Sequence, residues 1–147
     1  MKKIIVMVLG LFVCAAGLSA QNISFSVVGP EKLYNQLRLV NYTKKTSFDC
    51  QANFLVNRDG KLSVAKKLGG FHLEGYGDTD SKTVLKFIKR GDIIGLTLPS
   101  DMKKIAYEVY YEDLGPFDII EVYLYDQGSP KPDFSSSRDE SEANGEK

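Results

Sequence analysis

The chain has no tryptophan, one histidine and only two cysteines among its 147 residues. The missing tryptophan argues against a sugar-stacking platform. His72 is the single histidine, so a histidine-based metal site would need its other ligands from elsewhere. Cys50 is the only cysteine after residue 20, so that part of the chain has no internal disulfide. A Ser-His-Asp set, a phosphate-binding loop and a dinucleotide-binding fingerprint are also missing, and we predict that the protein is not an enzyme.

The basic residues also do not outnumber the acidic ones. The chain has 19 basic and 19 acidic residues, and losing Lys2 and Lys3 leaves 17 against 19. Nothing in this balance attracts a phosphate backbone. We therefore expect no nucleic-acid partner.

The first twenty residues have the pattern of a secretory signal peptide. Two lysines are followed by an apolar run of about ten residues at 4–13, and small residues then precede a cleavage site after Ala20. The run is too short to cross a bilayer as a helix. Residues 1–20 are therefore predicted to be removed, which leaves Gln21 as the first residue of a secreted or periplasmic protein with no transmembrane span.

Cys14 supports an alternative hypothesis. A bacterial lipoprotein signal ends in a cysteine that becomes acylated, and Cys14 follows Val13 within the apolar run. Acylation at this position would anchor the protein to a membrane by lipid rather than release it.

The other end of the chain differs in composition. Residues 127–147 are rich in serine, proline, glycine and acidic residues, and Phe134 is their only large apolar residue. Such a segment buries too little apolar surface to offset the entropy lost on ordering, so we predict a disordered tail. Residues 21–126 then form one folded domain of ordinary size.

The folded domain consists of short runs in which apolar and polar residues alternate. A period of two is typical of half-buried strands, and β-branched and aromatic residues dominate these runs. No segment keeps a helical apolar period for more than about two turns. Runs at a spacing of about ten residues predict an all-β sandwich or barrel. The predicted strands are 23–27, 36–42, 48–56, 61–67, 71–76, 83–88, 93–98, 104–112 and 117–126.

Glycine pairs mark the turns between these runs. Asp59-Gly60 is the strongest hairpin signal, because Asp tolerates the left-handed region and Gly adopts it without steric cost. Gly69-Gly70 is predicted to end one strand before the next begins.

Cys50 belongs to the strand predicted at 48–56. An unpaired thiol in an oxidising compartment is tolerated only if it is buried or partnered. Cys50 alternates with polar neighbours and shares its side of the strand with Phe48 and Phe54. The pattern favours a buried core cysteine over a nucleophile.

The segment 36–112 resembles a known family. A strand that ends in Asn41-Tyr-Thr43 leads to an alternating strand and then to the hairpin Asn57-Arg-Asp-Gly60-Lys61, and a Gly91-Asp92 turn introduces a later strand. This order is similar to the small immunoglobulin-like envelope domains of the FxLyD type. The resemblance implies an immunoglobulin-like antiparallel β-sandwich of about seven to nine strands. It also implies an accessory or binding role in the cell envelope, with no catalytic residues.

His72 and three acidic residues are the candidate polar sites. His72 shares a predicted strand face with Glu74, which suits an acid–base pair, although a solvated strand face explains the spacing equally well. Glu74, Asp78 and Asp80 lie near strand ends, where carboxylates gathered at one end of a sandwich would suit Ca²⁺. In the other interpretation, each aspartate bonds its own backbone in a turn. Calcium is the one cofactor considered, and otherwise none is predicted.

Tyrosines are the candidate binding residues. In the strand 117–126, one side is aliphatic, and the other carries Ile119, Tyr123 and Tyr125. If the aliphatic side faces the core, Tyr123 and Tyr125 point outward, beside Tyr110 on a neighbouring strand. Clustered tyrosines mark a binding surface, because each ring offers a large contact area at a low entropic cost. The alternative is a strand that is shielded on both sides.

These observations predict an exported, non-enzymatic binding or accessory domain of the cell envelope. It would contact an envelope or extracellular protein through a sheet face or an edge strand. The alternative function is a ligand-binding module that takes Ca²⁺, a glycan or a lipid at one end of the sandwich. The sequence leaves the partner and the oligomeric state open.

Overall fold

The computed structural model describes residues 3–7, 21–114, 117–130 and 132, and this part of the chain contains strands and turns but no helix. Most of the predicted signal peptide, including Cys14, and most of the predicted tail lie outside the described residues. The prediction of an all-β fold is confirmed. The strands are β1 (Lys3–Met7), β2 (Gln21–Ser26), β3 (Leu33–Tyr42), β4 (Phe48–Arg58), β5 (Lys61–Leu73), β6 (Thr79–Lys89), β7 (Ile93–Leu98), β8 (Ile105–Leu114) and β9 (Phe117–Asp126).

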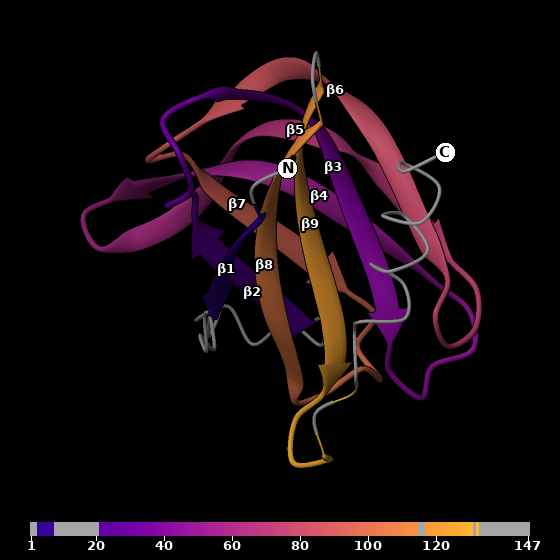
Figure 1. Ribbon diagram of the computed structural model, residues 1–147. Coiled ribbons are helices and arrows are strands. Elements are labelled where there is room, and N and C mark those ends of the chain that lie inside the picture. Colours follow the sequence, from indigo (N-terminus) through magenta and orange to yellow (C-terminus); the bar gives the residue numbers. More distant parts are fainter. Residues whose placement is uncertain (1–2, 8–20, 115–116, 131, 133–147) are drawn as a thin grey trace, which may run out of the picture.

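The strands form two sheets that pack face to face (Figure 1). The first sheet has the strand order β1-β8-β9-β3-β6, and the second has the order β2-β7-β4-β5. All neighbouring strands run antiparallel except β3 and β9, which are parallel. Antiparallel pairing throughout, which the resemblance implied, therefore does not hold here. These two strands are far apart in the chain, so no hairpin forces them to run in opposite directions.

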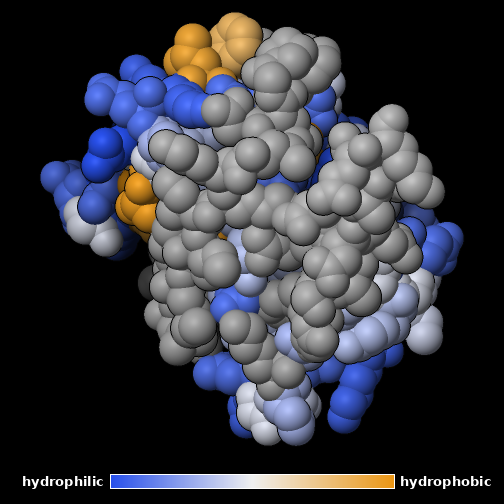
Figure 2. Space-filling view, in the orientation of Figure 1, coloured by the Kyte–Doolittle hydropathy of each residue, from blue (hydrophilic) through white to orange (hydrophobic). Residues whose placement is uncertain are grey.

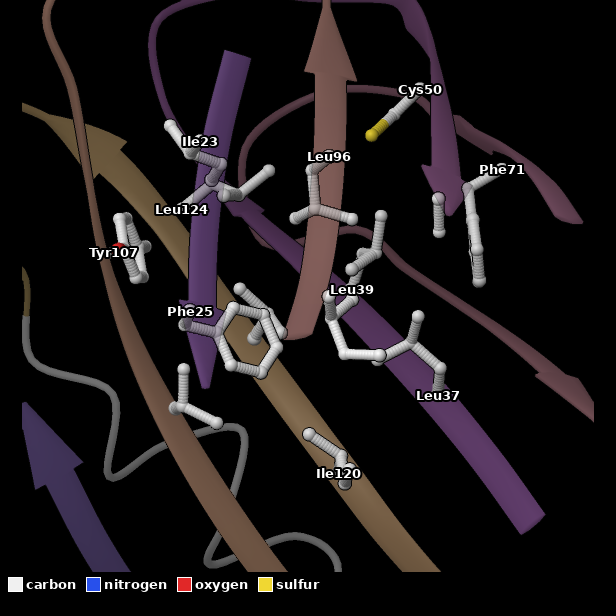
Figure 3. Packing of buried hydrophobic residues seen from close by; sticks show 14 of the residues in the cluster. Ile23, Phe25, Leu37, Leu39, Cys50, Phe71, Leu96, Tyr107, Ile120 and Leu124 are labelled. Carbon is white, nitrogen blue, oxygen red and sulfur yellow. The ribbon is translucent and has the colours of Figure 1, made fainter. Parts of the chain in front are cut away.

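The main core lies between the two sheets. In Figure 3, side chains from both sheets point toward one another, among them Phe25, Leu39, Leu96 and Tyr107. The alternation predicted for the last two strands is confirmed by the residues that belong to this core, which are Ile105, Tyr107, Val109 and Tyr111 of β8 and Ile120, Val122 and Leu124 of β9. The hydroxyl of Tyr107 donates a hydrogen bond to the carbonyl oxygen of Ser24 at 2.6 Å, which satisfies the one polar group of that ring.

Cys50 lies in this core, as predicted. Its side chain is buried and makes no disulfide. Burial raises the pKa of the thiol to about 12, because the apolar surroundings disfavour the thiolate. A nucleophilic role is therefore disfavoured in the folded protein.

The predicted hairpin at Asp59-Gly60 is confirmed. Arg58 at the end of β4 pairs with Lys61 at the start of β5, and the two residues between them have φ angles of 53° and 81°. Both angles lie in the left-handed region that a two-residue hairpin turn requires.

The predicted break at Gly69-Gly70 is wrong, because β5 continues through both glycines. Ala52 of β4 pairs with Gly69, whereas the next residue, Asn53, pairs with Lys67. Leu68 is thus the extra residue of a β-bulge. Glycine inside a strand often accompanies a bulge, and here it does so without ending the strand.

Asn41 is a buried polar hub near the end of β3. Its Nδ2 donates hydrogen bonds to the carbonyl oxygens of Lys45 and Glu74, both at 2.9 Å. Its Oδ1 accepts from the backbone N–H of Thr43 at 2.9 Å and from the Thr43 hydroxyl at 2.6 Å. One amide side chain therefore ties two loops to the end of β3.

The described part of the predicted signal segment is β1, which pairs with β8 at one edge of the first sheet.

After β9, the backbone N–H of Gln127 donates to the carbonyl oxygen of Lys104 at 2.8 Å. Within the described ranges, no helix is long and apolar enough to cross a membrane.

Candidate functional site

The outward side of β8, β9 and β3 carries a regular grid of side chains. Residues directly opposite one another on neighbouring strands share one side of the sheet, so the strand register defines rows that cross all three strands. We call this surface the tyrosine–glutamate face. Its rows, read from β8 through β9 to β3, are Ala106, Tyr125 and Tyr42; Glu108, Tyr123 and Val40; Tyr110, Glu121 and Arg38; and Glu112, Ile119 and Gln36.

Aromatic rings touch one another along this face. The ring centroids of Tyr110 and Tyr123 are 5.0 Å apart, edge to face, and Tyr123 stacks on Tyr42 at 6.1 Å. Tyr42 in turn meets Tyr76 edge-on at 4.9 Å. These separations are those at which aromatic pairs attract. Tyr76 is 66% exposed, so the row of rings runs from solvent into the buried part of the face.

The structure brings the predicted binding residues Tyr110, Ile119, Tyr123 and Tyr125 together on this face. They point away from the core between the sheets, on the outward side of the sheet whose strands β8, β9 and β3 lie in front in Figure 1. Their side chains are nevertheless buried, with Tyr123 only 1% exposed. Strand β9 is thus shielded on both sides, which was the alternative to exposed rings.

An ion pair lies in the middle of the grid. Arg38 Nη1 donates to Glu121 Oε2 at 3.0 Å, and Arg38 Nε donates to Ser81 Oγ at 2.9 Å. The side chain of Glu121 is 4% exposed. Burial, together with the Glu112 carboxyl group beside it, raises the pKa of Glu121 to about 7, although Arg38 acts in the opposite direction. Glu121 therefore exchanges its proton close to neutral pH.

The face carries more carboxyl groups than cations. Glu108, Glu112 and Glu121 are all buried in it, against the single guanidinium of Arg38. The Tyr110 hydroxyl donates to Glu108 Oε2 at 3.1 Å. The three glutamates therefore give the face more carboxyl groups than its one arginine can pair with.

A second polar group lies on β4 and β5, around His72. Its Nδ1 is 2.7 Å from Asp49 Oδ1, and its Nε2 is 3.1 Å from Glu74 Oε1. The hydrogen bond with Asp49, and then that with Glu74, raises the pKa of His72 above its ordinary value. All three side chains are more than half exposed, beside an open groove of about 490 Å³ that includes Lys82 and Asp80. This geometry suits a solvated imidazolium ion.

The acidic residues considered for calcium are engaged with the backbone. Asp80 Oδ2 accepts from the N–H of His72 at 3.0 Å, and Asp78 Oδ2 accepts from the N–H of Glu74 at 2.8 Å. The side chain of Glu74 is turned to His72. No three His, Cys, Asp or Glu side chains of the described chain are grouped so that they would hold a metal ion. The Asp78 contact lies within the turn at 74–78, whereas Asp80 bonds a backbone group eight residues before it.

Sequence reasoning missed two partners that distant strands supply. Arg38 lies 83 residues before Glu121, and Asp49 lies 23 residues before His72. Neither separation follows from a local pattern. One signal was present in the sequence, because Glu108 alternates in step with Tyr110 and so predicts a carboxylate on the same side as that ring.

The exposed apolar side chains lie elsewhere on the molecule. In Figure 2, the coloured surface is mostly hydrophilic, and orange apolar surface is limited to small spots at its margin. The large apolar residues that are exposed in the described part are Val28, Leu33, Val64, Tyr76 and Phe87. None of them belongs to the rows of the tyrosine–glutamate face.

Comparison of the chain with protein-family models, with curated proteins and with solved structures gives no match in any of the three. The resemblance to FxLyD-type domains therefore stays a prediction. The function is inferred below from the geometry of the site.

Proposed function

We propose that this protein is an exported, non-enzymatic binding domain of the cell envelope. Its tyrosine–glutamate face is buried in the full-length chain, and in our proposal it holds a partner protein once residues 1–20, which include β1 at the edge of this sheet, have been removed. The observation that carries the proposal is the grid itself, in which rings and carboxyl groups share the side of β8, β9 and β3 that faces away from the core. Export rests on the signal pattern of residues 1–20. The accessory role and the immunoglobulin-like topology rest on the resemblance to envelope domains.

The composition of this face differs from that of a core layer. In the described part of the chain, the buried charged residues are Glu108, Glu112 and Glu121, and all three lie on the tyrosine–glutamate face. The tyrosine–glutamate face adds an arginine and three glutamates to its rings. The described part of its own cluster comes only from β3, β8 and β9. Tyrosine and arginine are enriched where proteins bind one another, because they combine large contact area with directional hydrogen bonds.

The charge of the face indicates the chemistry of the partner. The face carries three carboxyl groups and one arginine, which is already bonded to Glu121 and Ser81. A partner surface with lysine or arginine side chains would compensate the excess of carboxylates. We therefore expect a basic contact surface on the partner.

A charge-neutral variant tests this proposal without removing buried rings. Glu108→Gln combined with Glu112→Gln keeps the shape of both side chains, whereas replacing Tyr123 by serine would leave a cavity in the sheet. Glu74→Gln is the matched control, because Glu74 is exposed on the second sheet. Tagged full-length protein would be crosslinked in envelope and secreted fractions of the source bacterium, after circular dichroism has shown that each variant folds.

We expect one recurrent protein to be captured by the wild type and by Glu74→Gln. The double variant should capture about tenfold less, in line with the loss of charged interface contacts. Equal capture by both variants would show that the tyrosine–glutamate face does not take part in binding the partner. The absence of any recurrent protein would contradict the proposed function altogether.

A further inference from the structure

Strand β8 has the composition of a central strand rather than an edge strand. Edge strands of stable proteins are usually short or carry charged residues, which discourages pairing with other chains. In this fold, β5 and β6 are edge strands with three lysines each, and β2 is an edge strand of only six residues. Strand β8 has ten residues and no lysine, arginine, proline or glycine. Its residues from Ile105 to Glu112 are all buried.

The outer edge of β8 is occupied by β1, a five-residue segment of sequence KIIVM. The pairing is antiparallel, with Lys3 opposite Glu112, Ile5 opposite Tyr110 and Met7 opposite Glu108. The edge thus accepts an extended apolar segment that begins with a basic residue. A lysine opposite a glutamate is a favourable cross-strand pair.

Residues 1–20 are the predicted signal peptide, so β1 would leave the protein when that segment is removed. The backbone N–H and C=O groups of β8 that face β1 would then lose their partners. Strand β8 carries acidic residues but no lysine or proline that would block pairing, and unpaired backbone groups on a long strand are a template for another strand. The processed protein therefore needs something to take the place of β1.

A second copy of the chain is a poor replacement. Antiparallel pairing of two β8 strands over the same five residues places Glu108 opposite Glu112 of the other copy, twice by symmetry. Like charges directly opposite one another destabilise a strand pair. Charge complementarity thus favours a strand with a basic residue at the position of Lys3.

We propose that, once residues 1–20 are removed, the edge of β8 from Glu108 to Glu112 accepts an extended segment of the partner protein. This segment is apolar and β-branched like β1, and it places a lysine or arginine opposite Glu112. The inference rests on the proposed function and adds to it that the partner extends the first sheet by one strand. Backbone hydrogen bonds supply the affinity, and the Glu112 pair sets the register.

The test uses full-length protein produced in an exporting bacterium, with its N-terminus determined by mass spectrometry. The probe is a capped peptide with the sequence of Lys3–Met7, and amide hydrogen exchange of β8 is the readout. We expect the processed protein to bind the peptide. Those amides of residues 108–112 that face the edge left by β1, rather than β9, should exchange at least about tenfold more slowly with peptide than without. A peptide with Ile5→Pro should have no effect, because proline lacks the N–H. A peptide with Lys3→Glu should bind more weakly.

Four outcomes would overturn the inference. Purified protein that still starts at Met1 would keep β1 in place. Amides of β8 that are fully protected without peptide would show a closed edge, and a concentration-dependent dimer protecting the same amides would assign the edge to a second copy. If the peptide fails to bind while the Glu108/Glu112 double variant still loses its captured partner, the strand mode is wrong and the proposed function stands.

Discussion

The ring of Tyr111 occupies the space in which a side chain at Gly29 would lie. A Cβ atom added to Gly29 would be 2.5 Å from Tyr111 Cγ, and the Tyr111 hydroxyl accepts the backbone N–H of Val28 at 3.1 Å. The chain that follows β2 is thus packed directly against a core ring of β8. No real Cβ atom tolerates this distance, so the glycine is required by close approach.

Gly29→Ala should therefore lower the free energy of unfolding by about 2–3 kcal/mol, because a buried ring cannot move aside cheaply. Gly95→Ala is the matched control. Its Cβ would meet Leu55 Cδ1 at 2.7 Å, and Leu55 is a half-buried, flexible side chain that can turn away. The control should change stability by less than about 1 kcal/mol. Urea denaturation measures both, and equal losses would contradict the packing described here.

Glu121 should make the free energy of unfolding decrease as the pH rises, which is opposite to the effect of most carboxyl groups. Its pKa is raised from 4.5 to about 7 in the folded protein by burial and by Glu112. The folded state therefore binds the proton more tightly than the unfolded state, so the free energy of unfolding falls as the pH rises between these two values. The largest contribution of this group is about 3 kcal/mol.

Glu121→Gln removes the titration and keeps the shape of the side chain. The variant should show a flatter free energy of unfolding between pH 5 and 8 than the wild type, and it should be the more stable of the two at pH 8. Glu31→Gln, at an exposed glutamate, should leave the slope of the wild type unchanged. Parallel profiles for Glu121→Gln and the wild type would show that Glu121 does not carry the effect.

Asn41→Ala should destabilise the domain by about 2–4 kcal/mol, because it strips hydrogen bonds from buried backbone groups that Asn41 serves in two loops. Thr43 and the carbonyl oxygens of Lys45 and Glu74 lose their partner at once. Asn57→Ala is the control, since Asn57 is exposed at the end of β4, and it should stay within about 0.5 kcal/mol of the wild type. Thermal and urea unfolding would measure the difference.

His72 should titrate above its ordinary pKa of 6.5, because carboxylates flank both ring nitrogens. Asp49→Asn should lower the pKa of His72 more than Glu74→Gln does, since the hydrogen bond that His72 donates to Asp49 is the larger cause. Nuclear magnetic resonance of the ring protons against pH measures the three values. A wild-type pKa at or below 6.5 would mean that the two carboxylates do not hold the ring in solution.

Features decided by a few neighbouring residues were predictable from the sequence. The Asp59-Gly60 turn depends on two residues, and the alternation in β8 and β9 depends on each strand alone. The position of Cys50 in the core followed from the same alternation. In each of these cases the local backbone and the burial pattern agree.

The features that escaped prediction depend on which strands become neighbours. The parallel pairing of β3 with β9 brings Arg38 to Glu121, and a local pattern contains no information about it. The break expected at Gly69-Gly70 failed because both glycines pair with β4, and the irregularity of the strand falls on Leu68 as a bulge. The burial of Tyr123 has a similar origin, since alternation separates the two sides of a strand but does not say what lies over the outer one.

Cys50 gives the molecule a built-in reporter of its own opening. Its thiol is buried and resists ionisation, so a thiol-reactive dye meets it only while β4 and its neighbours have separated. In a chain that carries Cys14→Ser, Cys50 is the one remaining thiol, and the rate of its labelling would report the frequency of these openings. The labelling rate of Cys50 thus measures how often the folded domain opens around β4, without a probe having to be introduced.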